Sequence, residues 1–375
     1  MEVYERLGVR TVVNAAATLT SLGGTAMAPQ AVEAMVSASR ASVDLVELQE
    51  AAGRRVAELT RNESALVTTG CAAAIALAVL AAATGGDPAR IASAPRGLDP
   101  RRVVVHRAHR IPYDRAVELV GGEIVEIGNV VQTFEWELEQ ALDAPTAAVL
   151  WVAGAHLPQS AALPLELVVD RCHARGVPVV VDAAAQLPPS SNLWSFTTGA
   201  GADLALFSGG KALRGPQASG LMVGSAALVA AAAANATPLQ RLARAMKVGK
   251  EEICGLVAAV ETYVAFDHSA REAHFESVVA SWTRQLEGIE GVTARRGYPN
   301  EAGQPVPRLE LELAPTAAVS PDELVKELWD GDPRVAVLRG AGRVVFATPD
   351  TLAGEHEEQI VVDRIRAVLT GAGPR

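Results

Sequence analysis

The sequence contains little cysteine, little positive charge and no long hydrophobic run. Its three cysteines are too few for a disulfide framework and lack the CxxC spacing of a zinc site, so we expect no bound metal. An odd number of thiols is typical of a reducing compartment, which predicts a cytoplasmic protein. The 33 basic residues against 43 acidic ones give a net charge of −10, which argues against nucleic acid as a partner.

Two alanine-rich runs come nearest to membrane spans. Residues 71–84 and 221–234 are both shorter than the roughly 18 residues that a spanning helix needs, and alanine gains little free energy on transfer to lipid. The opening residues MEVYERLGVR carry two acids and no apolar core, so they do not resemble a signal peptide. We therefore expect no membrane association and predict that both runs form buried helices.

Apolar runs that resemble strands alternate with helix-like segments through the first two thirds of the chain. These runs are continuous rather than alternating, which is typical of parallel strands that are buried on both faces. With 49% hydrophobic residues, the chain has enough apolar surface for a large core. We predict an α/β domain with a mostly parallel, seven-stranded sheet flanked by helices. The seven runs are residues 64–70, 101–106, 123–128, 146–152, 177–183, 204–208 and 220–225.

The pattern changes toward the C-terminus. There the sequence predicts one long helical stretch over residues 250–286, followed by strand-like segments and two further helices. Strands that follow one another, with two helices, indicate a small α+β domain. We assign residues 1–20 to an N-terminal arm, residues 21–245 to the large domain, and residues 246–375 to an interdomain helix with the small C-terminal domain.

Three polar clusters follow predicted strands, at the edge where parallel α/β sheets bind ligands. Residues 69–71 open a helix whose N–H groups favour a phosphate, although the same residues suit an ordinary strand–turn–helix. Asp182 ends a buried run, so it is either paired in a site or caps the next turn. Lys211 follows Ser208 and two glycines, and it is either a solvated turn lysine or a nucleophilic amine.

Taken together, the three clusters are the parts that are needed to hold pyridoxal phosphate. The helix N-terminus at residues 69–71 binds the phosphate, and Ser208 is an added donor. Asp182 pairs with the pyridine nitrogen and keeps it protonated, so that the ring remains an electron sink. Lys211 carries the cofactor aldehyde as a Schiff base.

The motifs around these clusters form a recognisable set. They are YERLGVRTVVNAA, TSLGGTAM, VTTGCAAA, HRAHRIPYDRA, VDAAAQLPP, GADLALFSGGKALRGPQASGLMVG and MKVGKEEICGL. On these motifs, which cover nearly the whole chain, the sequence resembles the fold type I pyridoxal-phosphate enzymes, within them the selenocysteine synthase-like / D-glucosaminate-6-phosphate ammonia-lyase group. The resemblance implies an aspartate aminotransferase-like fold and a homodimer or higher homo-oligomer with shared active sites.

The resemblance also assigns roles that spacing alone does not give. His109 falls where the group places a residue over the cofactor ring, whereas read alone it is a polar loop residue. Ala184 touches the other ring face, and Gln217 reaches a neighbouring subunit. Cys71 lies beside the phosphate, where we interpret it as a small packing residue. The implied cofactor-binding set is Thr69, Gly70, Cys71, His109, Asp182, Ala184, Ser208, Lys211 and Gln217, with Lys211, Asp182 and His109 as the catalytic residues.

Four further residues are candidates for substrate contacts. Lys247 and Lys250 lie in a basic segment similar to one in the group; they suit an anionic substrate or form a solvated helix face. Arg339 ends a predicted strand where fold type I enzymes often hold a substrate carboxylate, or it is a surface arginine. Thr20 belongs to an N-terminal loop that closes the cleft.

The implied reaction begins with loss of the Cα proton from an amino acid or amino sugar acid, which forms a Cα carbanion. The freed amine of Lys211 is the natural base for this step. We predict a pyridoxal-phosphate-dependent lyase that eliminates across Cα–Cβ and releases ammonia from a small-molecule substrate. A racemase or epimerase on the same frame, a transferase, and a non-catalytic cofactor-binding regulatory protein are the alternatives.

Overall fold

The chain divides into two compact units in the computed structural model, which describes residues 2–154 and 156–371. The larger unit contains Met27–Phe266 together with the short segment Ala302–Gln304. The smaller unit combines the N-terminal residues up to Ala26 with Asp267–Glu301 and the chain from Pro305 onward. The boundaries expected from sequence, at residues 20 and 245, stay a prediction.

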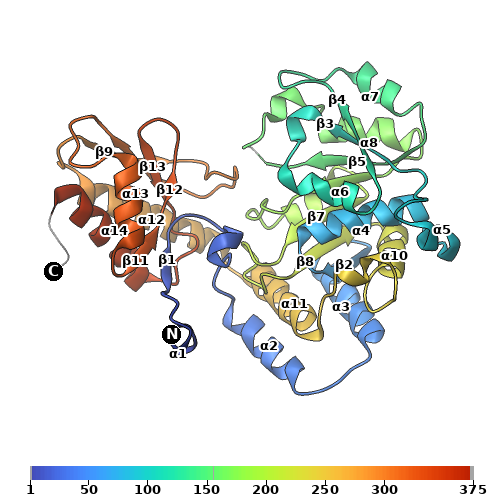
Figure 1. Cartoon of the computed structure of the whole chain (residues 1–375), viewed down its shortest axis with the longest axis horizontal. Helices are drawn as coiled ribbons and strands as arrows, with labels where there is room; N and C mark the ends of the chain where they lie inside the picture. The colour runs from blue at the N-terminus through green and yellow to red at the C-terminus, as the bar shows by residue number, and fades with distance from the viewer. Residues whose placement is uncertain (1, 155, 372–375) are drawn as a thin grey trace. The chain divides into compact units, whose positions relative to one another are not determined.

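The larger unit is built on a seven-stranded sheet with the order β2-β8-β7-β6-β5-β3-β4 (Figure 1). Strands β7, β6, β5, β3 and β4 run parallel, whereas β8 is antiparallel to both β7 and β2. This confirms the predicted mostly parallel sheet. The strands are β2 (Ser64–Thr68), β3 (Arg102–His106), β4 (Glu123–Ile127), β5 (Thr146–Val152), β6 (Val179–Asp182), β7 (Leu204–Ser208) and β8 (Gly220–Gly224).

Helices cover both faces of this sheet. One face packs against α4 (Cys71–Thr84), α6 (Arg115–Leu119) and α10 (Ala226–Asn235). The other face packs against α3 (Leu45–Thr60), α7 (Glu135–Ala141), α8 (Leu165–His173) and α11 (Lys250–Ala265). The remaining helices of this unit are α2 (Pro29–Ser39), which packs on α11, together with the short α5 (Pro88–Ser93) and α9 (Asn192–Trp194).

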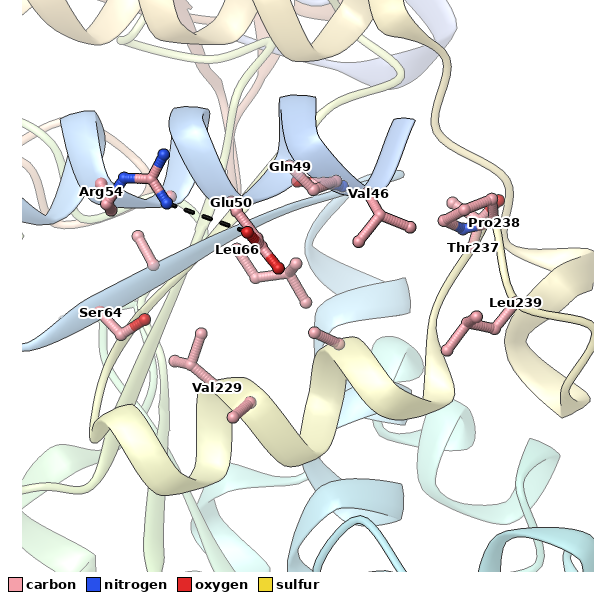
Figure 2. Close-up of a pocket in the computed structure, with 14 residues that line it drawn as sticks. Val46, Gln49, Glu50, Arg54, Ser64, Leu66, Val229, Thr237, Pro238 and Leu239 are labelled. Atoms are coloured by element: carbon pink, nitrogen blue, oxygen red, sulfur yellow. Dashed lines mark ion pairs between the residues drawn. The ribbon is translucent and has the colours of Figure 1, made fainter. Parts of the chain in front are cut away.

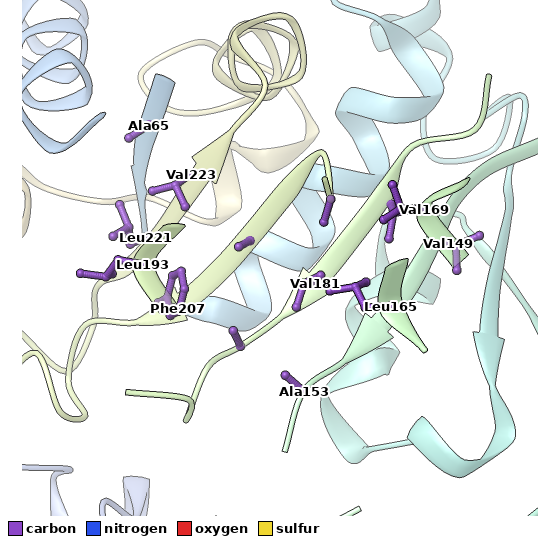
Figure 3. Close-up of a cluster of buried hydrophobic side chains, with 14 of the residues drawn as sticks. Ala65, Val149, Ala153, Leu165, Val169, Val181, Leu193, Phe207, Leu221 and Val223 are labelled. Carbon is purple, nitrogen blue, oxygen red and sulfur yellow. The ribbon is translucent and has the colours of Figure 1, made fainter. Parts of the chain in front are cut away.

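The continuous apolar strands follow from this double covering. Val180 belongs to the core on the α4 side, while its neighbours Val179 and Val181 belong to the core on the α8 side. Figure 3 shows the second of these cores, in which Val181 and Phe207 lie among side chains from neighbouring strands and helices. Because successive side chains point to opposite faces, a strand that is buried on both sides must be apolar at every position.

The long helical stretch predicted over residues 250–286 is two helices. Helix α11 ends at Ala265, and α12 (His268–Leu286) begins after Asp267. The carboxylate of Asp267 accepts a hydrogen bond of 2.9 Å from the Ala270 amide, which satisfies an N–H group of the new helix. The break falls where the chain passes from the larger to the smaller unit.

The smaller unit has the predicted α+β character. Its four-stranded antiparallel sheet has the order β12-β13-β10-β9, and α12 packs on β9 and β10. A second, two-stranded sheet pairs β1 (Val12–Asn14), from the N-terminal segment, in parallel with β11 (Arg334–Ala336). The other elements are α1 (Glu2–Arg6), β9 (Val292–Gly297), β10 (Arg308–Leu313), α13 (Pro321–Asp330), β12 (Leu338–Arg339), β13 (Val344–Ala347) and α14 (Glu355–Thr370).

Only the first alanine-rich run is a buried helix; the prediction for residues 221–234 was wrong, because this run begins in strand β8 and continues into α10, which buries only four of its residues. Helix α4 has all but two of its residues buried, and α10 packs beside it. No helix among the described residues combines the length and the apolar character that crossing a bilayer requires.

Candidate active site

The carboxyl ends of β6 and β7 bring Asp182 and the Lys211 loop to the same edge of the sheet. Asp182 is the last residue of β6 and is in register with Leu206 of the parallel strand β7. The Ala183 amide then donates to the Leu206 carbonyl at 2.9 Å. Lys211 follows three residues after Ser208, the last residue of β7. The sheet therefore brings Asp182 and the Lys211 loop to one carboxyl edge, the edge on which the sequence analysis expected both residues.

The carboxylate of Asp182 is buried and unevenly hydrogen-bonded. Its side chain is 4% exposed, and Oδ1 accepts from the Ala184 amide at 3.0 Å and from the Cys71 thiol at 3.5 Å. Oδ2 has no hydrogen-bond partner among the described residues. Burial raises the pKa of Asp182, while the two hydrogen bonds and the charges of Lys211 and His156 oppose that rise. Among the described residues, Oδ2 is thus left as an acceptor for a bound group.

Lys211 lies half-buried in a loop that folds back on itself. The Gly209 amide donates to the Ser219 carbonyl at 2.9 Å, and the Gly215 amide donates to the Gly209 carbonyl at 2.8 Å. A Cβ atom at Gly210 would meet the Gln217 backbone at 2.5 Å, so this close approach requires glycine. The charge of Lys211 acts on both Asp182 and Cys71, which places its amine within electrostatic reach of the two side chains.

The N-terminus of α4 forms an open cradle beside these residues. Gly70 has a φ of +88° and precedes the helix without any side-chain cap among the described residues. A Cβ atom on Gly220 would collide with the Gly70 backbone, so β8 can approach this turn only with glycine there, whereas a Cβ atom on Gly70 would meet nothing within 4 Å. Uncapped N–H groups at the positive end of a helix suit a phosphate. The cradle, the Oδ2 acceptor and the lysine together fit pyridoxal phosphate.

His109 is fixed in one neutral form. Its Nδ1 accepts a hydrogen bond from the Val152 amide at 3.2 Å, so the ring proton lies on Nε2, which is 3.1 Å from Gln159 Oε1. Gln159 Nε2 in turn donates to the carbonyls of Val152 and Gly154, both at 3.0 Å. Burial lowers the pKa of His109 to about 4, against the hydrogen bond that its Nε2 donates to Gln159.

Because both nitrogens of His109 are bound, the ring is not poised for proton transfer. It is completely buried, and its edge contact with Trp151 has a centroid distance of 4.9 Å. The predicted stacking of His109 over the cofactor requires the side chains around it to open one face. That role stays a prediction.

A second histidine, His106 at the end of β3, lies 5.2 Å from His109 between ring centroids. It is fully buried, and neither of its ring nitrogens has a hydrogen-bond partner among the described residues. Burial, and to a lesser extent the charge of His109, lowers the pKa of His106 to about 3 from 6.5. Below pH 6.5 the unfolded chain therefore binds more protons than the native protein does, and stability falls as the pH decreases.

We expect His106→Leu to flatten this acid sensitivity. Between pH 7 and pH 5, the free energy of unfolding of the variant should fall by about 1–2 kcal/mol less than that of the wild type. Urea unfolding at the two pH values measures this difference. Equal losses in both proteins would mean that the buried His106 ring is not the group that resists protonation.

Two of the predicted substrate residues are engaged in local structure. All three nitrogens of Arg339 are used: Nε donates to Asp322 at 2.8 Å, and the other two donate to carbonyls of its own hairpin. The Lys250 ammonium donates to the Ala38 carbonyl at 2.7 Å and pairs with Glu251. A substrate anion would have to replace these contacts.

The other predicted residues differ in exposure. Lys247 and Gln217 are exposed in the larger unit, and Thr20 is exposed in the smaller one, where it begins a single helical turn. Ala184, which donates to Asp182 through its backbone, is half-buried. The roles assigned to all four stay predictions.

The end of β5 adds residues that the sequence analysis missed. His156 is exposed after this strand, and its charge acts on Asp182. Its Nδ1 lies 3.4 Å from the Ala302 carbonyl, which also accepts from Gln186 at 3.2 Å. The signal was the polar stretch HLPQS after a buried strand, the same strand-end rule that identified Asp182 and Lys211.

The larger unit also has an apolar pocket that shares no residue with this site. It has a volume of about 410 Å³ and lies between α3, β2 and α10 (Figure 2). Its side chains include Val46, Leu66, Val229 and Leu239, and Glu50 and Arg54 of α3 form an ion pair of 4.0 Å at its border. The pocket therefore offers mainly apolar surface.

Comparisons with known proteins agree with this geometry. A family model described as SelA, L-seryl-tRNA selenium transferase, matches residues 12–291. Over 99% of its length, the chain is 32% identical to a D-glucosaminate-6-phosphate ammonia lyase of Salmonella typhimurium (strain 14028s / SGSC 2262), of which it covers 98%. Over 99% of its length, it is 36% identical to a 5'-C-glycyluridine monooxygenase-decarboxylase of Streptomyces sp, of which it covers 92%.

The comparison with solved structures also finds an ammonia lyase. The structure of D-glucosaminate-6-phosphate ammonia-lyase superposes with a TM-score of 0.87 at 31% identity and 99% coverage of both chains. Ureidoglycine-glyoxylate aminotransferase from Bacillus subtilis, at 14% identity and a TM-score of 0.61, shares the fold. Fold and site thus define a pyridoxal-phosphate-dependent enzyme of the aspartate aminotransferase-like fold. The chain belongs to the L-seryl-tRNA selenium transferase (SelA) family.

Proposed function

We propose that this enzyme is an ammonia-releasing lyase that acts on an amino acid or an amino sugar acid. When bound, pyridoxal phosphate supplies an electron sink conjugated to the substrate amine. The reaction removes the Cα proton and a leaving group from Cβ, and hydrolysis then yields ammonia and a keto acid. The full-length similarity to an ammonia lyase, in sequence and in structure, supports this class of reaction.

In this proposal the residues of the strand-end edge divide the work of binding and proton transfer. Lys211 holds the cofactor and, once the substrate amine has replaced it, takes the Cα proton. Asp182 presents Oδ2 to the ring nitrogen and favours its protonated form. The α4 N-terminus, from Thr69 to Cys71, binds the phosphate, and Ser208 adds a donor. The single observation that carries the proposal is that Asp182 ends β6 and Lys211 lies in the loop after the neighbouring strand β7, with their charges interacting.

A substrate screen tests the reaction class. Purified holoenzyme is incubated with amino acids and amino sugar acids, with and without a phosphate group, and ammonia and keto acid are measured together. We expect the two products in equal amounts and no release by Lys211→Ala. Deuterium incorporation at Cα without either product would identify a racemase instead.

Oxidative decarboxylation is the second candidate, because the Streptomyces relative is 36% identical over nearly the whole chain. The same screen separates the two. Consumption of oxygen with release of carbon dioxide, and no ammonia, would replace the lyase assignment.

We also propose that the chain works as a homo-oligomer in the cytoplasm. Helix α2 exposes Val32 and Val36 one turn apart, and Val43 and Val46 are exposed beyond it. Apolar side chains grouped in this way are typical of protein interfaces. Light scattering on the purified protein should give the mass of a dimer or a larger assembly, and a monomer at working concentration would contradict this.

A further inference from the structure

Cys71 makes a contact that a mere packing residue does not need. It is the first residue of α4, so its backbone belongs to the phosphate cradle. Its side chain turns toward Asp182, and Sγ lies 3.5 Å from Oδ1. Helix α4 and strand β6 meet at this contact, although the two residues are far apart in the sequence. One residue therefore joins the two ends of the proposed cofactor site.

The two hydrogen bonds to Asp182 both go to the same oxygen. The Ala184 amide, at 3.0 Å, and the Cys71 thiol both donate to Oδ1, and Oδ2 receives nothing from the described residues. A carboxylate held at one oxygen has a fixed orientation, so the other oxygen points in one direction only. Each donor to the charged form also favours that form.

We propose that Cys71 is a positioning residue for Asp182, whose thiol holds Oδ1 so that Oδ2 faces the ring nitrogen of pyridoxal phosphate. The inference rests on the proposed function, because it assumes that Asp182 serves the cofactor. In this role Cys71 affects cofactor binding only by orienting Asp182, and it does not contact the substrate.

The protonation state of the thiol agrees with this role. A helix N-terminus ordinarily lowers the pKa of a cysteine. Here burial and then the carboxylate of Asp182 raise the pKa of Cys71 well above its usual range, against the charge of Lys211. The group therefore remains an S–H donor at working pH and is a poor nucleophile.

The test compares Cys71→Ala, which removes the donor, with Cys71→Ser, which keeps one. The dissociation constant of pyridoxal phosphate is measured by titrating it into full-length protein that has been stripped of cofactor. We expect Cys71→Ala to raise this constant about 10-fold, the size expected for losing one hydrogen bond to a charged group. Cys71→Ser should stay close to the wild type. Cys254→Ala, a half-buried thiol on α11, is the matched control and should have no effect.

A double-mutant cycle separates positioning from packing. In an Asp182→Asn background, Cys71→Ala should cause no further loss of cofactor affinity, because the group through which it acts is already changed. An equal loss for Cys71→Ala in both backgrounds, or equal losses for the alanine and serine variants, would overturn the inference. An unaffected Cys71→Ala beside an impaired Asp182→Asn would overturn the role of Cys71 alone. An Asp182→Asn variant with the cofactor affinity of the wild type would also contradict the proposed role of Asp182.

Discussion

Lys211→Ala should give a folded protein that no longer binds pyridoxal phosphate covalently and that turns substrate over at least about 1000-fold more slowly. The large loss is expected because one amine serves both as the attachment point of the cofactor and as the base for the Cα proton. The fold should survive because Lys211 lies in a half-buried loop and is not part of either sheet core.

Visible absorbance and circular dichroism measure the two halves of this prediction. The visible band of lysine-bound cofactor should be lost, while the far-ultraviolet spectrum is unchanged. Lys326→Ala is the matched control, since Lys326 pairs with Asp330 on the surface of α13. A Lys211→Ala protein with a normal visible band would place the covalent attachment elsewhere.

Asp182→Asn should lower the activity of the enzyme and raise the stability of the cofactor-free protein. Asparagine keeps the shape of the side chain but lacks the charge that holds the ring nitrogen protonated, so we expect turnover to fall by more than about 100-fold. In the absence of cofactor, the same variant should be more stable than the wild type at neutral pH.

The stability gain follows from the direction of the pKa shift. Because burial raises the pKa of Asp182 above 3.8, the native protein keeps the proton to a higher pH than the unfolded chain does. Stability of the wild type therefore falls as the pH rises between the two pKa values, and the buried carboxylate remains costly above them. Removing it should raise the melting temperature near pH 7.

Thermal unfolding of cofactor-free protein at several pH values checks this prediction. The advantage of Asp182→Asn should shrink as the pH decreases and should vanish below 3.8, where both side chains are neutral. A variant that is less stable at neutral pH would show that the carboxylate is already compensated without the cofactor.

The sequence predicted the sheet well because its strands are buried on both faces. Seven continuous apolar runs identified the seven strands within a few residues, and the polar residues directly after them gave Asp182 and the Lys211 loop. These features depend on local composition. The split between α11 and α12 also had a local signal, the capping residue Asp267, but helical periodicity continues on both sides and hid it.

Other features depend on contacts between distant segments. The pairing of β1 with β11 joins residues 12–14 to residues 334–336, and no local pattern indicates it. The same is true of the Cys71 contact with Asp182 and of the network around His109, in which Gln159 holds the ring. The resemblance to the family placed His109 near the cofactor, but only its hydrogen bonds show that both ring nitrogens are occupied.

Mass spectrometry after borohydride reduction tests the central claim most directly. Borohydride converts the carbon–nitrogen double bond between a lysine and pyridoxal phosphate into a stable single bond, and digestion then identifies the modified peptide. The account predicts the cofactor mass on the peptide that contains Lys211. Its appearance on Lys247, Lys250 or Lys326, or on no lysine of the cofactor-loaded protein, would contradict it.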